Sequence, residues 1–90
     1  GVYAAWAWIN KQNTPLPAVM NLGPQPTIDP NSPSAVEVNL LDQKIELSGE
    51  ELIIEPIEKL RNQKQFADLQ ALVRQIEKDA LLAKKILNVQ

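Results

Sequence analysis

Alternation of apolar and polar residues along the first two thirds of the chain predicts β-strands. Runs rich in β-branched and aromatic residues suit a half-buried strand, in which successive side chains point to opposite faces. Five such runs are separated by turn residues: Val2–Ile9, Ala18–Leu22, Ser34–Asp42, Lys44–Leu47 and Glu51–Leu60. Pro56 lies inside the last run and cannot donate to a sheet ladder, so it indicates an edge, a bulge or a barrel corner.

The apolar pattern changes to a helical period after residue 67. Apolar residues then recur at the spacing of one helix face: Leu69, Leu72, Val73, Ile76, Ala80, Ala83 and Leu87. Asp68 is placed to cap the N-terminus of this helix, and Lys84 and Lys85 suit the negative end of its dipole. The pattern therefore predicts one long C-terminal helix whose apolar stripe packs against the strands.

The order of these elements indicates the fold class. Strands followed by a single helix, without alternation, argue against a parallel sheet. Pro24–Pro33 holds four prolines, which stop both helix and strand, so we expect a long loop there. Short strands joined by turns favour a mainly β fold, a small antiparallel Greek-key β-barrel with one long C-terminal α-helix.

Composition excludes several functional classes. Ninety residues suffice for one domain, and a net charge of −2 without a basic stripe argues against nucleic acid as a partner. No apolar run approaches the roughly 20 residues that cross a bilayer, and no secretory signal is evident, so a cytoplasmic protein without a membrane partner is expected. The sequence has no Cys and no His, so proton transfer would fall to a carboxylate.

Three places along the chain could carry chemistry, and each also has a purely structural interpretation. Glu37 lies in mid-strand between two valines and is either a solvent-facing residue or a general base. Asn21–Thr27 is either functional or a rigid turn packed by prolines. Arg61–Lys64 is either a ligand-binding loop or a solvated connection to the helix. Common nucleotide-binding and metal-binding signatures do not occur.

A series of short motifs runs in order through the whole chain. Its members are Gly1-Val2-Tyr3-Ala4, Asn21-Leu22-Gly23 with Pro26-Thr27, Val36-Glu37-Val38 with Leu40-Leu41-Asp42, Gly49-Glu50-Glu51-Leu52, Leu60-Arg61 with Lys64 and Phe66, and the helix residues Leu69, Leu72, Gln75, Ile76 and Asp79. In order and spacing, this series resembles the C-terminal kinase domain of the prokaryotic bifunctional FAD synthetases, in which riboflavin kinase is fused to FMN adenylyltransferase.

The resemblance implies a riboflavin kinase-like, six-stranded barrel that transfers the γ-phosphoryl group of ATP, bound with Mg²⁺, to the 5′-hydroxyl of riboflavin, giving FMN. Glu37 matches the glutamate that serves as the catalytic general base in the family. The residues that match the flavin-binding region are Arg61, Asn62, Lys64, Phe66 and Leu69. Asn39 and Asp42 match positions close to the nucleotide. The resemblance assigns no metal ligand to these 90 residues.

The sequence departs from the family pattern in several places. Asn39 stands where the family usually has His, and Gln43 where it has Phe. The family's glycine-rich ATP loop and its Pro-Thr-Ala-Asn motif lie upstream of the Gly-Val-Tyr strand, and Pro26-Thr27 aligns with a later segment, so no metal role passes to Thr27. We therefore expect residues 1–90 to be a domain fragment that lacks the first strand and the glycine-rich segment.

Two consequences follow from that expectation, and two other functions remain open. The fragment alone should form FMN poorly, and an exposed barrel edge could pair with a second copy. The expected partners are riboflavin and ATP. The alternatives are a non-catalytic flavin-binding or protein-interaction β-barrel module, and a barrel without a ligand. Quenching of riboflavin fluorescence separates these two alternatives from each other.

Overall fold

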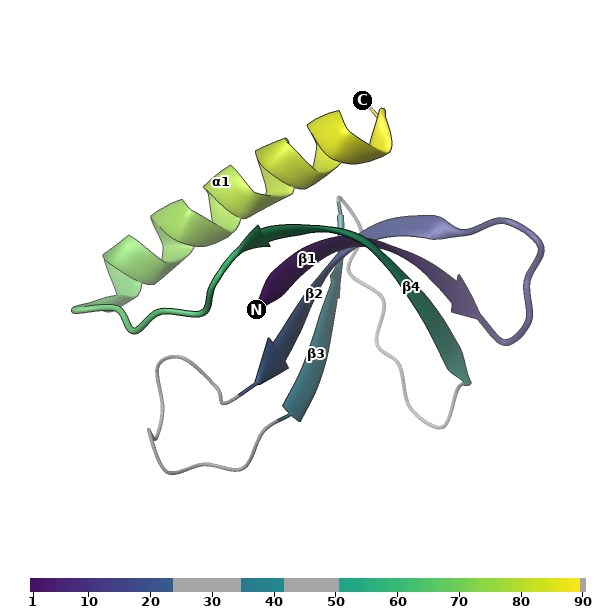
Figure 1. Cartoon of the computed structure of the whole chain (residues 1–90), viewed down its shortest axis with the longest axis horizontal. Coiled ribbons are helices and arrows are strands. Elements are labelled where there is room, and N and C mark those ends of the chain that lie inside the picture. The colour runs from purple at the N-terminus through teal and green to yellow at the C-terminus, as the bar shows by residue number, and fades with distance from the viewer. Residues whose placement is uncertain (24–34, 42–50, 90) are drawn as a thin grey trace.

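Four antiparallel strands and one C-terminal helix make up the part of the chain that the computed structural model describes, residues 1–23, 35–41 and 51–89 (Figure 1). The elements are β1 (Val2–Ile9), β2 (Leu16–Gly23), β3 (Ala35–Leu40), β4 (Leu52–Arg61) and α1 (Leu69–Leu87). The mainly β class with a long C-terminal helix is thus confirmed. No helix among the described residues is long and apolar enough to cross a membrane.

The strands form one sheet in the order β3-β2-β1-β4. β1, β2 and β3 follow one another as neighbours, and β4 returns to pair with β1, which is the Greek-key arrangement. In Figure 1, β1 and β4 curve as they pass under the helix, as strands of a barrel wall do. Within the described residues β3 and β4 are the two edges, and the sheet does not close between them. Self-association through such an edge stays a prediction.

The predicted strands agree with the structure wherever it describes them. β1 has the predicted bounds, and β3 and β4 lie within one residue of theirs or inside them. β2 begins two residues earlier than expected, because Leu16 and Pro17 already pair with β1. Asp42 and the segments Pro24–Pro33 and Lys44–Leu47 lie outside the described residues.

Pro56 lies in an edge strand, where a residue without a backbone N–H interrupts the fewest hydrogen bonds of the sheet. β4 is an edge strand of the described sheet, and its register with β1 shifts beside this proline: Ala4 pairs with Glu58, and the next residue, Ala5, pairs with Pro56. The extra residue between the two partners forms a bulge that bends the strand. The sequence-based prediction of an edge or a bulge is therefore confirmed, and both occur at once.

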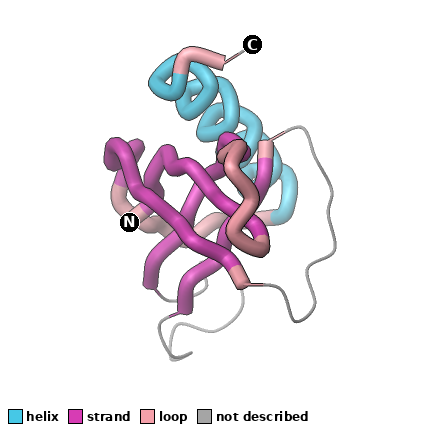
Figure 2. Tube along the Cα trace, turned by 90° about the vertical axis from the view of Figure 1, so that its right-hand side faces the viewer, coloured by secondary structure: helices cyan, strands magenta, loops and turns pink. Residues whose placement is uncertain are grey.

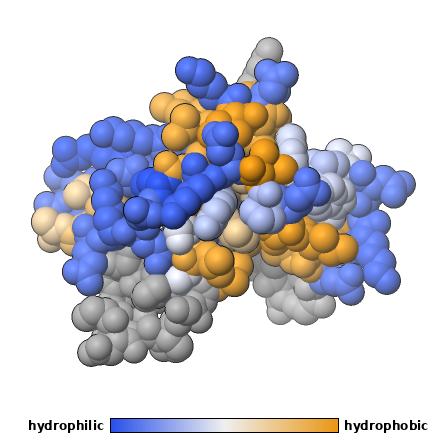
Figure 3. Space-filling view, viewed as in Figure 1, coloured by the Kyte–Doolittle hydropathy of each residue, from blue (hydrophilic) through white to orange (hydrophobic). Residues whose placement is uncertain are grey.

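α1 lies against one face of the sheet, as Figure 2 shows. Asp68 caps the helix by accepting a hydrogen bond of 2.8 Å from the Ala71 N–H, and Asn88 ends it in the left-handed conformation. Buried core residues come from the sheet and from the C-terminal half of the helix: Val2, Ala4, Val19, Leu41, Ala83 and Leu87. In Figure 3 hydrophobic residues gather over the same half of the helix and the sheet beneath it.

The prediction that the whole apolar stripe of the helix is buried is wrong. Leu69 is 73% exposed and Ile76 is 50% exposed, whereas the buried helix residues are Asp79, Ala83 and Leu87. Ala83 and Leu87 belong to the predicted stripe, so its C-terminal part is buried as expected, whereas its N-terminal part is exposed. Asp79, one turn before Ala83, is buried beside them and forms an ion pair with Arg61 of β4.

Candidate functional site

Glu37 projects from the face of the sheet that carries α1. It pairs in register with Asn21 of β2, which pairs with Val2 of β1, which in turn pairs with Arg61 of β4. Directly opposed residues in antiparallel strands place their side chains on the same face. Val2 is 1% exposed and belongs to the core beneath the helix, so the Glu37 side chain shares that face.

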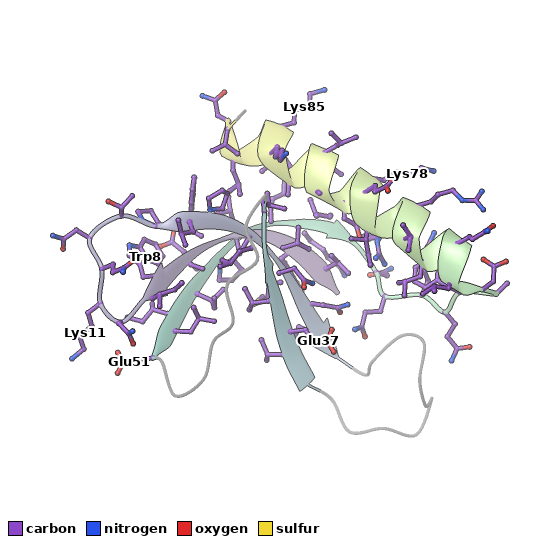
Figure 4. The ribbon with its side chains drawn as sticks, turned by 180° about the vertical axis from the view of Figure 1, so that it is seen from behind. Trp8, Lys11, Glu37, Glu51, Lys78 and Lys85 are labelled. Carbon is purple, nitrogen blue, oxygen red and sulfur yellow. The ribbon has the colours of Figure 1, made fainter. Side chains whose placement is uncertain are left out.

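The surroundings of Glu37 leave its carboxylate available to a ligand. The side chain is partly buried, whereas the preceding Val36 points to the opposite face and is 60% exposed. Figure 4 shows the Glu37 side chain on the side of β3 that faces the beginning of α1. The Glu37 carboxylate forms no hydrogen bond or ion pair with any other residue that the structure describes. Glu37 thus lies on the helix-bearing face of the sheet, and its role as a general base stays a prediction.

A buried ion pair anchors the end of β4 to the helix. The Arg61 Nε donates to both carboxylate oxygens of Asp79 at 2.9 and 3.2 Å, and its Nη2 donates to Oδ2 at 2.8 Å. Asp79 is only 5% exposed, and it also accepts a hydrogen bond of 3.0 Å from Gln75 Nε2. This fork-like pairing is the strong form of an ion pair, and it fixes the direction in which residues 62–68 leave the sheet.

Two cations flank the ring of Phe66. The guanidinium carbon of Arg61 lies 5.9 Å from the ring centroid, and Lys64 Nζ lies 5.4 Å from it. Both distances are within the range of cation–π attraction. Arg61 Nη1 also donates to the Asn62 carbonyl at 3.0 Å, so one guanidinium organises the whole turn.

A hollow of about 350 Å³ lies at the beginning of the helix. The residues that line it are Phe66, Ala67, Asp68, Leu69 and Leu72. Leu69 is largely exposed, so an apolar ring placed in this hollow would cover it. Of the residues predicted to contact flavin, Phe66 and Leu69 line this hollow, and Arg61 and Lys64 lie beside the Phe66 ring.

A second anchor ties the same turn to β2. Gln63 Nε2 donates to Asn21 Oδ1, and the Gln63 side chain crosses the backbone at Gly23. Gly23 has φ +135°, a conformation that favours glycine, and a Cβ built there would meet the end of the Gln63 side chain, which would have to move. Because Asn21 is the register partner of Glu37, this anchor joins the predicted flavin turn to the strand pair that carries the predicted base.

The two nucleotide-proximal predictions have different outcomes. Asn39 lies two residues beyond Glu37, on the same face, opposite Val19 and exposed. Asp42 lies outside the described residues. Among the residues that the structure does describe, no group of three or more acidic, His or Cys side chains could hold a metal ion.

Sequence reasoning missed the structural roles of Asp79, Gln63 and Asn21. For Asp79 a signal existed, because it lies four residues before Ala83, one turn along the side of the helix that proved to be buried. A carboxylate in such a position requires a buried cationic partner. For Gln63 and Asn21, which lie 42 residues apart, no local pattern reveals the contact.

Comparison with known proteins gives a consistent set of similarities. A family model described as riboflavin kinase matches residues 1–87. The bifunctional riboflavin kinase/FMN adenylyltransferase of Escherichia coli strain K12 is 36% identical over 85 residues, covering 94% of this chain and 26% of that protein. The enzyme of the same name from Bacillus subtilis strain 168 is 38% identical over 82 residues, covering 88% of this chain and 25% of that protein.

A protein named RNA-binding riboflavin kinase, from the same Bacillus strain, is also similar. It is 34% identical over 79 residues, covering 88% of this chain and 34% of that protein. The chain spans about a quarter of the length of the two bifunctional relatives and about a third of the length of this one.

Proposed function

The chain belongs to the riboflavin kinase family, and from that membership we propose that it forms the riboflavin-binding and proton-accepting part of an enzyme that makes FMN. The reaction is transfer of the γ-phosphoryl group of ATP to the 5′-hydroxyl of riboflavin. One observation carries the proposal at the level of residues. Glu37 and Arg61, where the flavin-binding turn begins, lie at opposite ends of one row across the helix-bearing face of the sheet.

The dimensions of this row suit the substrate. Glu37 and Arg61 are separated by three strand spacings, or about 14 Å. A tricyclic ring resting against Phe66 and Leu69 could therefore extend its polyol tail along the sheet toward Glu37. The remaining members of the proposed flavin site are Asn62 and Lys64, which lie on the same turn. Arg61 contributes by holding this turn, since Asp79 and the Asn62 carbonyl occupy its guanidinium.

The proposed mechanism gives Glu37 one task. Its carboxylate accepts the proton of the 5′-hydroxyl while that oxygen forms a bond to the γ-phosphorus and the bond from the γ-phosphorus to the leaving ADP oxygen breaks. Phosphoryl transfer depends mainly on positioning and on neutralising charge, so a single well-placed carboxylate is sufficient on the acceptor side. We propose that Mg²⁺ enters with ATP as part of the substrate, and that Asn39 and Asp42 lie toward the nucleotide.

The proposed partners are small molecules. Although one relative is named RNA-binding, the net charge of −2 gives this chain little with which to neutralise phosphates, so we propose riboflavin and ATP without RNA. Residues 1–90 contain no Pro-Thr-Ala-Asn motif, so we further propose that they form FMN poorly when separated from the intact protein.

The test is FMN formation from riboflavin and ATP by the intact protein, followed by chromatography of the flavins. The proposal predicts FMN that depends on ATP. Quenching of riboflavin fluorescence without FMN formation would instead indicate a non-catalytic flavin-binding module, and neither signal would indicate a barrel without this ligand.

Replacing Phe66 with alanine is expected to weaken riboflavin binding about five- to tenfold, because loss of an aromatic contact costs roughly 1 kcal/mol beyond buried area. Fluorescence quenching gives the dissociation constant directly. Leu81→Ala is the matched control, since Leu81 is an exposed apolar residue on the far side of α1. If Phe66→Ala and the wild type bind riboflavin with equal affinity, Phe66 is not part of the flavin-binding site.

A further inference from the structure

We propose that Gln63 is a positioning residue for this reaction: it holds the flavin-binding turn at a fixed place relative to Glu37. The inference rests on the proposed function and extends it to two residues, Gln63 and Asn21, that contact neither the flavin ring nor the phosphoryl group in that proposal. Its basis is the contact between the turn and β2, which joins segments 42 residues apart in the sequence.

The backbone of β2 is shaped to receive the Gln63 side chain. Asn21 accepts its amide hydrogen bond, and Gly23 leaves the space that the side chain occupies. At Gly23 the φ of +135° disfavours any side chain, and a Cβ there would displace the end of the Gln63 side chain from its place beside β2. The Asn-Leu-Gly motif, which sequence reasoning left between a function and a rigid turn, thereby acquires a definite task.

The contact lies one strand away from the proposed base. Asn21 is the direct register partner of Glu37, and Gly23 is that of Ala35, so Gln63 lies across the part of β2 that pairs with the beginning of β3. Neighbouring strands are about 4.8 Å apart. Because only one strand spacing separates this contact from Glu37, a shift of Gln63 relative to β2 should change the distance between the turn and Glu37 by a similar amount.

Among the described residues, the turn is anchored to the helix and to the sheet, and these two contacts act in different directions. Arg61 ties it to Asp79 on the helix, whereas Gln63 ties it to the sheet. If only the second anchor is lost, the ring and cations of the turn remain assembled through Arg61, but their position over the sheet is no longer fixed. Flavin binding should then survive, while the hydroxyl loses its alignment with Glu37.

The first variant to test is Gln63→Ala in the intact protein. The expected result is a kcat for FMN formation lowered about tenfold or more, because misplacement by an ångström is enough to cost up to about 100-fold. The riboflavin dissociation constant and the midpoint of thermal unfolding should stay close to those of the wild type. Gln65→Ala is the matched control, since Gln65 is an exposed glutamine of the same turn, and its kcat should be unchanged.

A swapped pair then tests whether the contact itself is responsible. Asn21→Gln with Gln63→Asn keeps the two amides and the summed length of the two side chains. Each single substitution should lower kcat, and the double variant should recover a large part of it, because residues in contact couple non-additively. A merely structural role would change stability without this recovery.

The possible outcomes separate the inference from the proposed function. If the wild type and Gln65→Ala form FMN but Gln63→Ala does so equally fast, or if the swapped pair recovers nothing, the positioning role is overturned and the proposed function stands. If Gln63→Ala weakens riboflavin binding by the same factor by which it lowers kcat, Gln63 is a binding residue, and the positioning role is again overturned. If the wild type forms no FMN, the proposed function fails, and this inference fails with it.

Discussion

Replacing Glu37 with glutamine is expected to lower kcat for FMN formation by about 100-fold or more, because a positioned general base typically contributes 10² to 10⁴ in rate. The amide has nearly the same shape as the carboxylate and can still hydrogen-bond to the hydroxyl, but it cannot accept the proton. Riboflavin affinity should therefore change little. Steady-state kinetics at saturating riboflavin and ATP give kcat, and fluorescence quenching gives the affinity.

The matched control for this variant is Glu77→Gln, an equally conservative change at an exposed position of α1. It should leave both kcat and affinity unchanged. A Glu37→Gln enzyme that turns over as fast as this control would show that the carboxylate on β3 takes no part in proton transfer, whatever the fate of the flavin turn.

Replacing Asp79 with alanine is expected to be the most destabilising single substitution considered for this chain. Removing one partner of a fully buried ion pair costs about 3–5 kcal/mol, and because the Arg61 side chain is 19% exposed, the cost here should lie toward the lower end of that range. Arg61 would lose three of its four hydrogen bonds, and Gln75 would lose its acceptor. A small domain has only about 5–15 kcal/mol in total, so much of its stability would go. Equilibrium urea denaturation measures the change in the free energy of unfolding.

Two further variants test whether loss of the Arg61–Asp79 ion pair causes the destabilisation. Lys78→Ala changes the exposed residue beside Asp79 and should alter stability by no more than about 0.5 kcal/mol. Replacing Arg61 and Asp79 together by leucine removes both charges, and it should be much less damaging than Asp79→Ala alone. The role of the ion pair would be refuted if Asp79→Ala proved as stable as Lys78→Ala.

Local patterns were sufficient to predict the elements themselves. The run of β-branched and aromatic residues located β1 with its observed bounds, and Pro56 correctly indicated an edge and a bulge. Asp68 was recognised as the cap of α1 because its type and its place before the apolar period are both local properties. The Greek-key order also followed, since runs of short strands before one helix leave few other arrangements.

The same patterns could not show how far the sheet extends beneath the helix. Periodicity identifies an apolar face of α1, but only its C-terminal part is buried at Ala83 and Leu87, and Leu69 and Ile76 are exposed. The pair between Arg61 and Asp79, which are 18 residues apart, holds α1 to β4. A long-range ion pair leaves no periodic trace in the sequence, apart from one carboxylate where an apolar residue would pack better.

For the candidate site, the sequence predicted which residues take part, and the structure showed where they lie relative to one another. Glu37 was selected because it lies between valines in a strand, yet alternation alone does not say which face is covered. The register with Asn21 and Val2 decides that question, since Val2 belongs to the core under α1. The flavin turn was likewise proposed as a set of neighbours, and its anchors to the helix and to β2 became visible only in three dimensions.

The most direct test of the proposed site is a crystal structure of the intact protein with riboflavin bound. The expected result places the 5′-hydroxyl oxygen about 2.6–3.2 Å from a carboxylate oxygen of Glu37, with the ring against Phe66. A complex in which the polyol tail runs away from β3, so that Glu37 meets only solvent, would contradict it.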